Sequence, residues 1–124
     1  MNTALWIVQA LLALVFLGSG ALKLTQSREQ LVPRVGEWVQ DYPAGGIKAI
    51  GAAEVLAAIG LIVPPATHIL PVLAPLAAVG LVAVMAGALV VHARRGEYSK
   101  VAVNLVLAAC AIFVAWGRFG PYRF

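Results

Sequence analysis

The chain has 124 residues, of which 62% are hydrophobic and 11% are charged, with a formal net charge of +4. Soluble domains carry about 25% charged residues, so this composition, with a mean hydropathy of +0.93, excludes an ordinary soluble protein and indicates one membrane domain. The basic residues lie in loops and at the ends of apolar runs, which is typical of membrane topology, and we expect no nucleic-acid partner.

The first predicted element is an apolar run over residues 4–24, long enough to cross the lipid bilayer as a helix. No Lys or Arg precedes it, and its length of about twenty residues favours a retained transmembrane helix over a cleaved signal peptide. Gln9, Ser19 and Lys23 lie near one face of this helix, with Phe16 between them. We expect that face to line the interior of a bundle, although Lys23 could instead extend its ammonium group outward to water.

A longer connection follows over residues 25–46. Apolar residues recur at helical spacing over residues 31–42, with charged residues between them, which predicts a short amphipathic helix. Pro33 suits the first position of such a helix. This interfacial helix would lie on the membrane surface or cap the bundle, with Trp38 as its anchor.

The second transmembrane helix is predicted over residues 47–63, close to the shortest length that spans a bilayer. Glu54 lies inside it, about 10 Å from its start at 1.5 Å per residue. A charge at the centre of a membrane helix costs on the order of 2.5–3.5 kcal/mol on insertion scales. Glu54 should therefore face the interior with Lys23 as its first partner, and with Asn104 or His92 within reach.

Two further transmembrane helices are predicted over residues 69–91 and 101–117. A tight turn at residues 64–68 precedes the first of them, and a polar loop at residues 92–100 joins the two. The sequence thus predicts an all-α, polytopic membrane protein with a single domain over residues 1–124. Its four transmembrane helices form a compact bundle, with the amphipathic interfacial helix between the first two.

Small residues recur every four positions at Ala49, Ala53 and Ala57, and again at Ala83 and Gly87. Small side chains let membrane helices approach closely, so these positions are expected helix contacts. They would serve packing within one bundle or contact in a homodimer.

The distribution of basic residues predicts the orientation in the membrane. Four spans place both termini on one side and the connections 25–46 and 92–100 on the other. The loop side carries Lys23, Arg28, Arg34, Lys48, Arg94, Arg95 and Lys100, and the terminal side carries Arg118 and Arg123. The positive-inside rule then makes both loops cytoplasmic and both termini external in a bacterial-type inner membrane. An aromatic belt at the outer interface would comprise Trp6, Trp116, Phe119 and Tyr122.

Each predicted span contributes one polar residue to the cytoplasmic half of the bundle, namely Lys23, Glu54, His92 and Asn104. Together with Ser19 and Phe16 they form a predicted pocket for a ligand or a partner. The structural alternative is that Lys23 and Glu54 only fix helix register, Asn104 only bonds a neighbouring helix, and His92 is solvated.

No arrangement of Ser, His and Asp is present, so no catalytic residue is assigned. Glu54 and His92 are too few ligands for a metal site, and none is predicted. Cys110, the one cysteine, is expected to be an inert apolar residue.

Four stretches, "VFLGSGALKL", "IGAAEVLAAIGLIVP", "AGALVVHARRGE" and "NLVLAACAIFVAWG", together resemble the DoxX-like family of small four-helix membrane proteins. The positions that match the family pattern are Lys23, Glu54, His92 and Asn104. The resemblance implies a diffuse function, because some members are associated with quinone-linked oxidoreductases or oxidative-stress complexes. A vertebrate relative is an assembly chaperone for an acetylcholine-gated channel.

We therefore expect an accessory or assembly factor that binds another membrane protein or a lipid-like ligand through the pocket around Glu54. No cofactor is evident, and quinone or lipid are the candidate ligands. One alternative is a component of a quinone-linked oxidoreductase, with Glu54 and His92 passing protons to the quinone. Another is a small transporter or proton path along Gln9, Ser19, Lys23 and Glu54. A role without catalysis is favoured, because no electron-carrying motif is visible.

Overall fold

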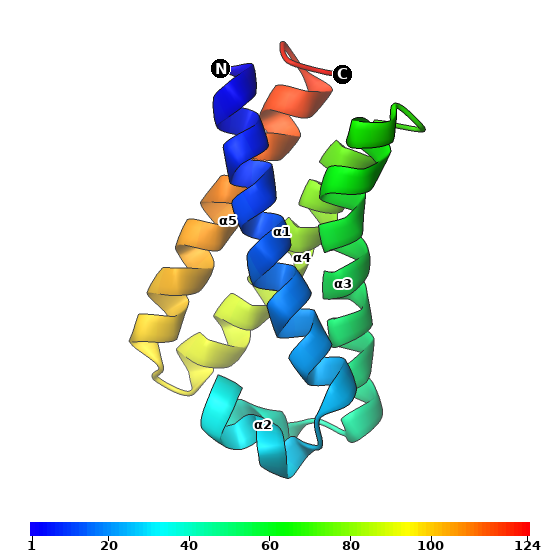
Figure 1. Ribbon diagram of the computed structural model, residues 1–124. Coiled ribbons are helices and arrows are strands. Elements are labelled where there is room, and N and C mark those ends of the chain that lie inside the picture. Colours follow the sequence, from blue (N-terminus) through cyan, green and yellow to red (C-terminus); the bar gives the residue numbers. More distant parts are fainter.

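The computed structural model describes residues 1–124 and consists of helices joined by short connections (Figure 1). The four long helices are α1 (Asn2–Thr25), α3 (Ala44–Thr67), α4 (Leu73–Arg94) and α5 (Tyr98–Phe119). Each is long and apolar enough to cross a membrane, and lipid forces such runs into helices because it offers the backbone no hydrogen-bond partners. The predicted all-α fold with four transmembrane helices is confirmed, and the chain is an integral membrane protein.

The connection between α3 and α4 lies later in the chain than the sequence predicts. α3 continues through Pro64 and Pro65, where a tight turn was expected, and ends only at His68 in a left-handed conformation (φ 58°). A proline inside a helix has no backbone N–H and therefore removes one hydrogen bond. At Pro65, the bond that is lost is the one to the carbonyl of Leu61, four residues earlier. The side-chain amide of Gln9 donates to this carbonyl instead, at 2.7 Å, so the helix tolerates the proline.

The predicted interfacial helix over residues 31–42 is instead two shorter elements, α2 (Arg28–Val35) and the 3-10 helix η1 (Glu37–Asp41). They separate at Gly36, whose φ of 116° disfavours any side chain and whose missing Cβ leaves room for Lys100 Nζ. α2 starts earlier than predicted because Ser27 forms a capping box, and Pro33 therefore lies inside the helix instead of at its first position. We call α2 and η1 together the cap.

The four long helices form two pairs, α1 with α3 and α4 with α5. Figure 1 shows these pairs close together at the end that holds both chain termini and far apart at the opposite end. The cap spans the gap between the diverging pairs. We call the two ends of the bundle the terminal end and the cap end.

The apolar core lies between the pairs and consists of Leu12, Phe16, Ala58, Leu61, Ala78, Leu81, Met85, Ala111 and Val114. α1 and α3 cross most closely at two glycines. A Cβ on Gly20 would lie 2.6 Å from the carbonyl oxygen of Gly51, and a Cβ on Gly51 would lie 2.8 Å from Lys23 Cβ. Only glycine permits this approach of the two backbones.

The small residues predicted to make helix contacts mostly do not pack the bundle. Ala49, Ala53, Ala83 and Gly87 are exposed, and Ala57 is half-buried. The expectation that they pack within one bundle was therefore wrong for these four exposed positions, because the close crossing falls at Gly20 and Gly51. Their role in a homodimer stays a prediction.

Candidate functional site

Lys23 and Glu54 meet inside the bundle, beside the crossing of α1 and α3. Lys23 Nζ donates to Glu54 Oε1 at 2.7 Å, and the two residues are only 7% and 2% exposed. Ser19 completes the group, because its hydroxyl accepts from Lys23 Nζ at 2.7 Å and donates to Glu54 Oε2 at 3.2 Å. Glu54 therefore faces the interior and pairs first with Lys23, as the membrane argument predicts.

The close crossing explains why this pair forms. Gly20 precedes Lys23 by three residues, and Gly51 precedes Glu54 by three residues, so each charged side chain lies one turn beyond its glycine. The contact between the two glycines brings those turns together. A buried pair with an additional hydrogen bond meets the requirement that charge inside hydrocarbon be compensated.

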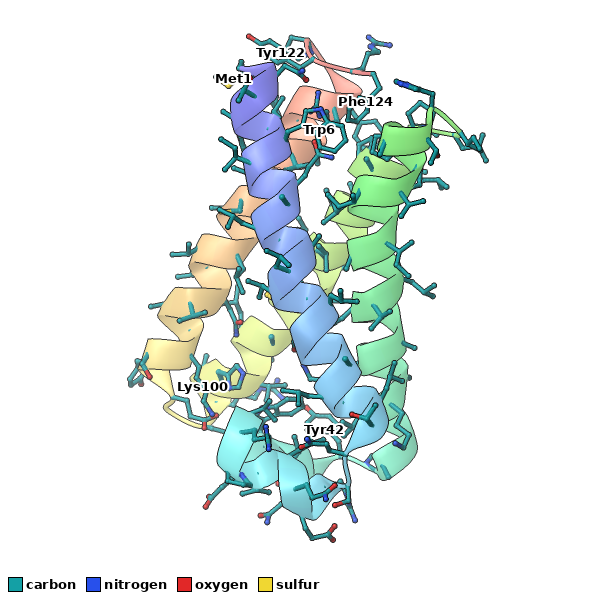
Figure 2. All side chains as sticks on the ribbon, viewed as in Figure 1. Met1, Trp6, Tyr42, Lys100, Tyr122 and Phe124 are labelled. Atoms are coloured by element: carbon teal, nitrogen blue, oxygen red, sulfur yellow. The ribbon has the colours of Figure 1, made fainter.

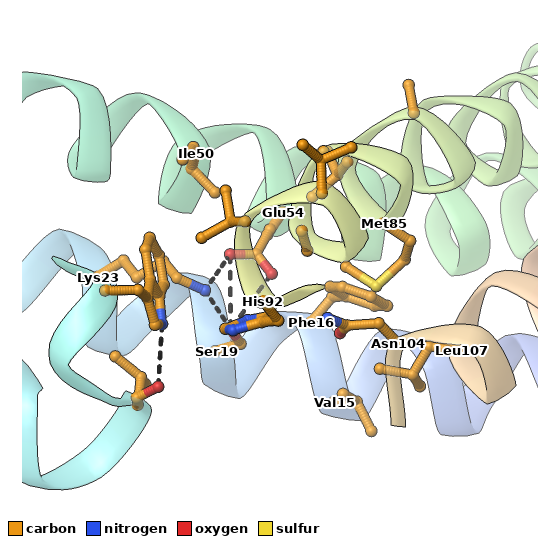
Figure 3. A pocket seen from close by; sticks show the side chains of 18 of the residues that line it. Val15, Phe16, Ser19, Lys23, Ile50, Glu54, Met85, His92, Asn104 and Leu107 are labelled. Carbon is orange, nitrogen blue, oxygen red and sulfur yellow. Dashed lines mark hydrogen bonds and ion pairs between the residues drawn. The ribbon is translucent and has the colours of Figure 1, made fainter. Parts of the chain in front are cut away.

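A cavity of about 640 Å³ extends from this pair between the diverging helix pairs (Figure 3). We call it the wedge pocket. The predicted site residues all line it, namely Phe16, Ser19, Lys23, Glu54, His92 and Asn104, and so does Trp38. Its remaining walls are mainly apolar and include Val15, Ile50, Met85 and Leu107. The polar groups come from all four long helices, although they are far apart in the sequence.

Trp38 closes the cap end of the wedge pocket. Its ring lies edge-on to His92, with ring centres 6.0 Å apart, and 5.8 Å from Lys23 Nζ. Its indole nitrogen donates to the carbonyl of Val35 at 2.9 Å. Of the two positions expected for the interfacial segment, the structure shows the one in which it caps the bundle, with Trp38 half-buried against it.

The loop after α4 and the first turn of α5 hold the cap in place. Arg95 Nη1 donates to Asp41 Oδ2 at 2.6 Å, and Lys100 Nζ donates to the carbonyl of Val35 at 3.1 Å. Figure 2 shows Lys100 and Tyr42 at the cap end, opposite Met1, Trp6, Tyr122 and Phe124. The cap is thus fastened to α4 and α5 by polar contacts, while the chain itself joins it to α1 and α3.

His92 lines the wedge pocket but is not hydrogen-bonded to Glu54. Its Nδ1 lies 2.9 Å from Glu97 Oε1, in the loop that follows α4. The hydrogen bond from His92, with Lys100 as a second partner, lowers the pKa of Glu97 below its ordinary value, so this carboxylate stays ionised at neutral pH. Nδ1 must then donate, because an ionised carboxylate only accepts. The sequence analysis missed Glu97, which is folded back toward His92 by a turn at Gly96 (φ 70°).

Asn104 also lines the wedge pocket without bonding to Glu54. Its side-chain nitrogen Nδ2 is buried and has no hydrogen-bond partner in the protein. Neither His92 nor Asn104 therefore takes part in the ion pair, and both present polar groups to the cavity.

A second buried polar cluster lies at the terminal end and was missed by the sequence analysis. Arg118, counted there as a charge outside the bundle, is 3% exposed and donates from Nε to Gln9 Oε1 at 2.8 Å. Its Nη1 donates to Asn2 Oδ1 at 2.6 Å, and the Phe124 ring covers its guanidinium at 4.0 Å. Trp6 of the predicted aromatic belt packs edge-on against Phe124.

This second cluster corrects the expected polar stripe along α1. Gln9 was predicted to line one interior face together with Ser19 and Lys23, but it bonds Arg118 and the Leu61 carbonyl at the other end of the bundle. Phe16 and Leu12 of the apolar core lie between Gln9 and Ser19. The structure therefore does not support a continuous polar path from Gln9 to Glu54.

These features define a class of protein: a small four-helix integral membrane protein with a compensated ion pair beside a cavity that opens between its helices. The chain belongs to the DoxX-like family, which matches residues 7–114, and the resemblance stated from the sequence is confirmed. The match includes every polar residue that lines the wedge pocket from the long helices. No curated protein and no solved structure matches the chain significantly.

Proposed function

We propose that this chain is an accessory membrane protein that binds a lipid-like amphiphile in the wedge pocket. The observation that carries the proposal is the layout of the cavity, with polar side chains grouped around Glu54 and apolar side chains over the remaining wall. Small-molecule sites are mostly apolar with a few polar groups that fix the ligand's orientation. A molecule with one polar head and an apolar body matches this division.

The size of the cavity favours a small molecule over a partner helix. Ligand pockets commonly measure roughly 300–1,000 Å³, and the wedge pocket, at about 640 Å³, falls inside this range. A single turn of an α-helix with its side chains occupies roughly 400–600 Å³, from its diameter and pitch. The pocket would hold little more than one turn of a partner helix.

Access from the bilayer also supports the proposal. Val15 on α1 and Gly87 and Val90 on α4 line the wedge pocket and are exposed. The cavity is therefore not sealed inside the bundle, and its exposed walls belong to helices that are long and apolar enough to lie in lipid. A quinone or another lipid could enter sideways, which would suit a subunit of a redox complex or an assembly factor that carries a lipid.

A pair of matched glycines provides the test. Gly87 and Gly80 lie two turns apart on α4, and a Cβ on either meets nothing within 4 Å, but only Gly87 lines the wedge pocket. Gly87→Phe should fill the cavity and reduce the amount of the co-purifying amphiphile at least tenfold, as measured by mass spectrometry of lipid extracts. Gly80→Phe should leave it unchanged. Equal amounts from both variants would contradict binding in the wedge pocket.

A further inference from the structure

The charges inside the wedge pocket balance without any ligand. Lys23 Nζ and Glu54 Oε1 are 2.7 Å apart, and Ser19 satisfies a further bond of each. His92 is bonded through Nδ1 to Glu97, whose carboxylate lies in the loop beyond the helix. A charged head group in the cavity would have no free counter-ion among these residues.

Two cations that contact the cap from other segments, Arg95 and Lys100, are also paired. Arg95 pairs with Asp41 at 2.6 Å and with Glu97 at 3.3 Å. Lys100 pairs with Glu97 at 3.4 Å and donates to the carbonyl of Val35. An anionic head group would have to displace one of these acids, and an unpaired charge in an apolar cavity is strongly unfavourable.

Two polar groups of the pocket remain unused by the protein. Asn104 Nδ2 is buried with no hydrogen-bond partner, although buried donors in folded proteins ordinarily have one. His92 uses Nδ1 for Glu97, and its second ring nitrogen, Nε2, bonds no protein atom. Figure 3 shows both side chains turned into the space beside Phe16 and Glu54. The pocket is therefore equipped to recognise a ligand by neutral hydrogen bonds.

We infer that the wedge pocket selects an amphiphile whose head group is uncharged and carries hydroxyl or carbonyl oxygens. Asn104 Nδ2 donates to a hydroxyl or carbonyl oxygen of this head group, and His92 Nε2, the acceptor in the tautomer whose Nδ1 donates to Glu97, accepts from a hydroxyl group beside it. The apolar tail extends along Phe16 and Leu107 toward the opening near Val15. This inference rests on the proposed function, because it names the class of ligand for the same pocket.

Three probes of defined charge test the inference with the purified full-length chain in detergent. 1-Monooleoylglycerol offers hydroxyl groups, a short-chain prenylated quinone offers carbonyl groups, and oleoyl lysophosphatidic acid is monooleoylglycerol with a phosphate added. Native mass spectrometry gives their dissociation constants. We expect at least one uncharged probe to bind at least tenfold more tightly than the phosphate, and the stronger of the two identifies the preferred oxygen type.

Variants of Asn104 separate recognition from structure. Asn104→Leu keeps the approximate shape but removes the donor, so the uncharged probe should bind about tenfold more weakly. The variant should be as stable as the native protein or more stable in thermal unfolding, because it removes a buried donor that has no partner. Asn104→Gln keeps an amide and should retain most of the affinity.

Each contrary result has its own meaning. Equal or tighter binding of the phosphate probe, or unchanged affinity in Asn104→Leu, would overturn the inference about the head group and leave the proposed function intact. A clear loss of thermal stability in Asn104→Leu would also overturn it, since Asn104 would then be a structural residue. If none of the probes binds and Gly87→Phe co-purifies the same lipids as Gly80→Phe, the proposed function itself fails.

Discussion

Glu54 is the one acidic residue within the four long helices. A carboxylate inside a membrane helix is tolerated where it has a partner, and here Lys23 Nζ and the Ser19 hydroxyl supply the hydrogen bonds. Such a pair can hold α1 on α3, and it can also serve a ligand in the adjoining cavity. A buried ion pair can often be replaced by apolar residues with little loss of stability, whereas removing one partner is costly.

Two substitutions distinguish a structural from a functional role for this pair. Lys23→Met leaves Glu54 buried without its cation and should destabilise the protein by about 3–5 kcal/mol, measured by unfolding in detergent. Adding Glu54→Gln removes the unpaired charge and should restore most of the stability. If the pair serves the ligand, this stable double variant should still bind the amphiphile more weakly; native affinity in it would assign the pair to structure alone.

At the scale of elements, the crossing of α1 and α3 and the docking of the cap together build the wedge pocket. The crossing depends on glycines that no hydrophobic pattern singles out, because Gly18 and Gly20 look equivalent in the sequence. In the structure, only Gly20 meets the neighbouring backbone, and a Cβ on Gly18 would meet nothing within 4 Å. The cap depends equally on contacts with a distant segment, through Arg95 after α4 and Lys100 in the first turn of α5.

The crossing can be tested with alanine. Gly51→Ala should separate α1 from α3 and destabilise the protein by about 1–3 kcal/mol, because the added Cβ would meet Lys23 Cβ and the Gly20 carbonyl. Gly18→Ala is the matched control and should be neutral or stabilising by up to about 1 kcal/mol, since alanine favours a helix. Thermal unfolding in detergent measures both; equal effects of the two substitutions would show that the crossing is not sterically limited.

At the scale of the whole molecule, the two ends of the bundle differ in shape and in charge. At the terminal end the helix pairs lie close together and Arg118 on α5 donates to Gln9 on α1, whereas at the cap end the pairs diverge and the cap lies between them. Because Arg118 is buried, Arg123 is the one Arg or Lys side chain left exposed at the terminal end. Lys23 is buried as well, so the count of seven against two in the sequence becomes six against one among the accessible basic residues, and the bias toward the cap end remains.

This contrast predicts that the cap end faces the cytoplasm. In a background with Cys110→Ala, a cysteine at the exposed position Ser99 should react with a membrane-impermeant maleimide only from the cytoplasmic side. A cysteine at the exposed position Ala66, at the terminal end, should react only from outside. The reverse labelling pattern would place the cap and the polar end of the wedge pocket on the external side.

The sequence by itself determined the four spans and the pairing of Glu54 with Lys23. Both follow from local properties, since the length of an apolar run decides whether it crosses a bilayer and the cost of a bare charge in lipid demands a partner. Lys23 was chosen because it ends the first helix at the same end of the bundle. The selection of His92 and Asn104 as residues that face the interior rested on the same reasoning.

Only the tertiary structure decided how these residues are used. Several features depend on contacts that the sequence pattern does not report. They are the divergence of the helix pairs, the break of the cap at Gly36, the bond between His92 and Glu97, and the burial of Arg118 against Gln9. Hydrophobic periodicity reports which face of a helix is buried, but not which neighbour covers it or at what angle. The wedge pocket exists because of those angles, and no single segment encodes it.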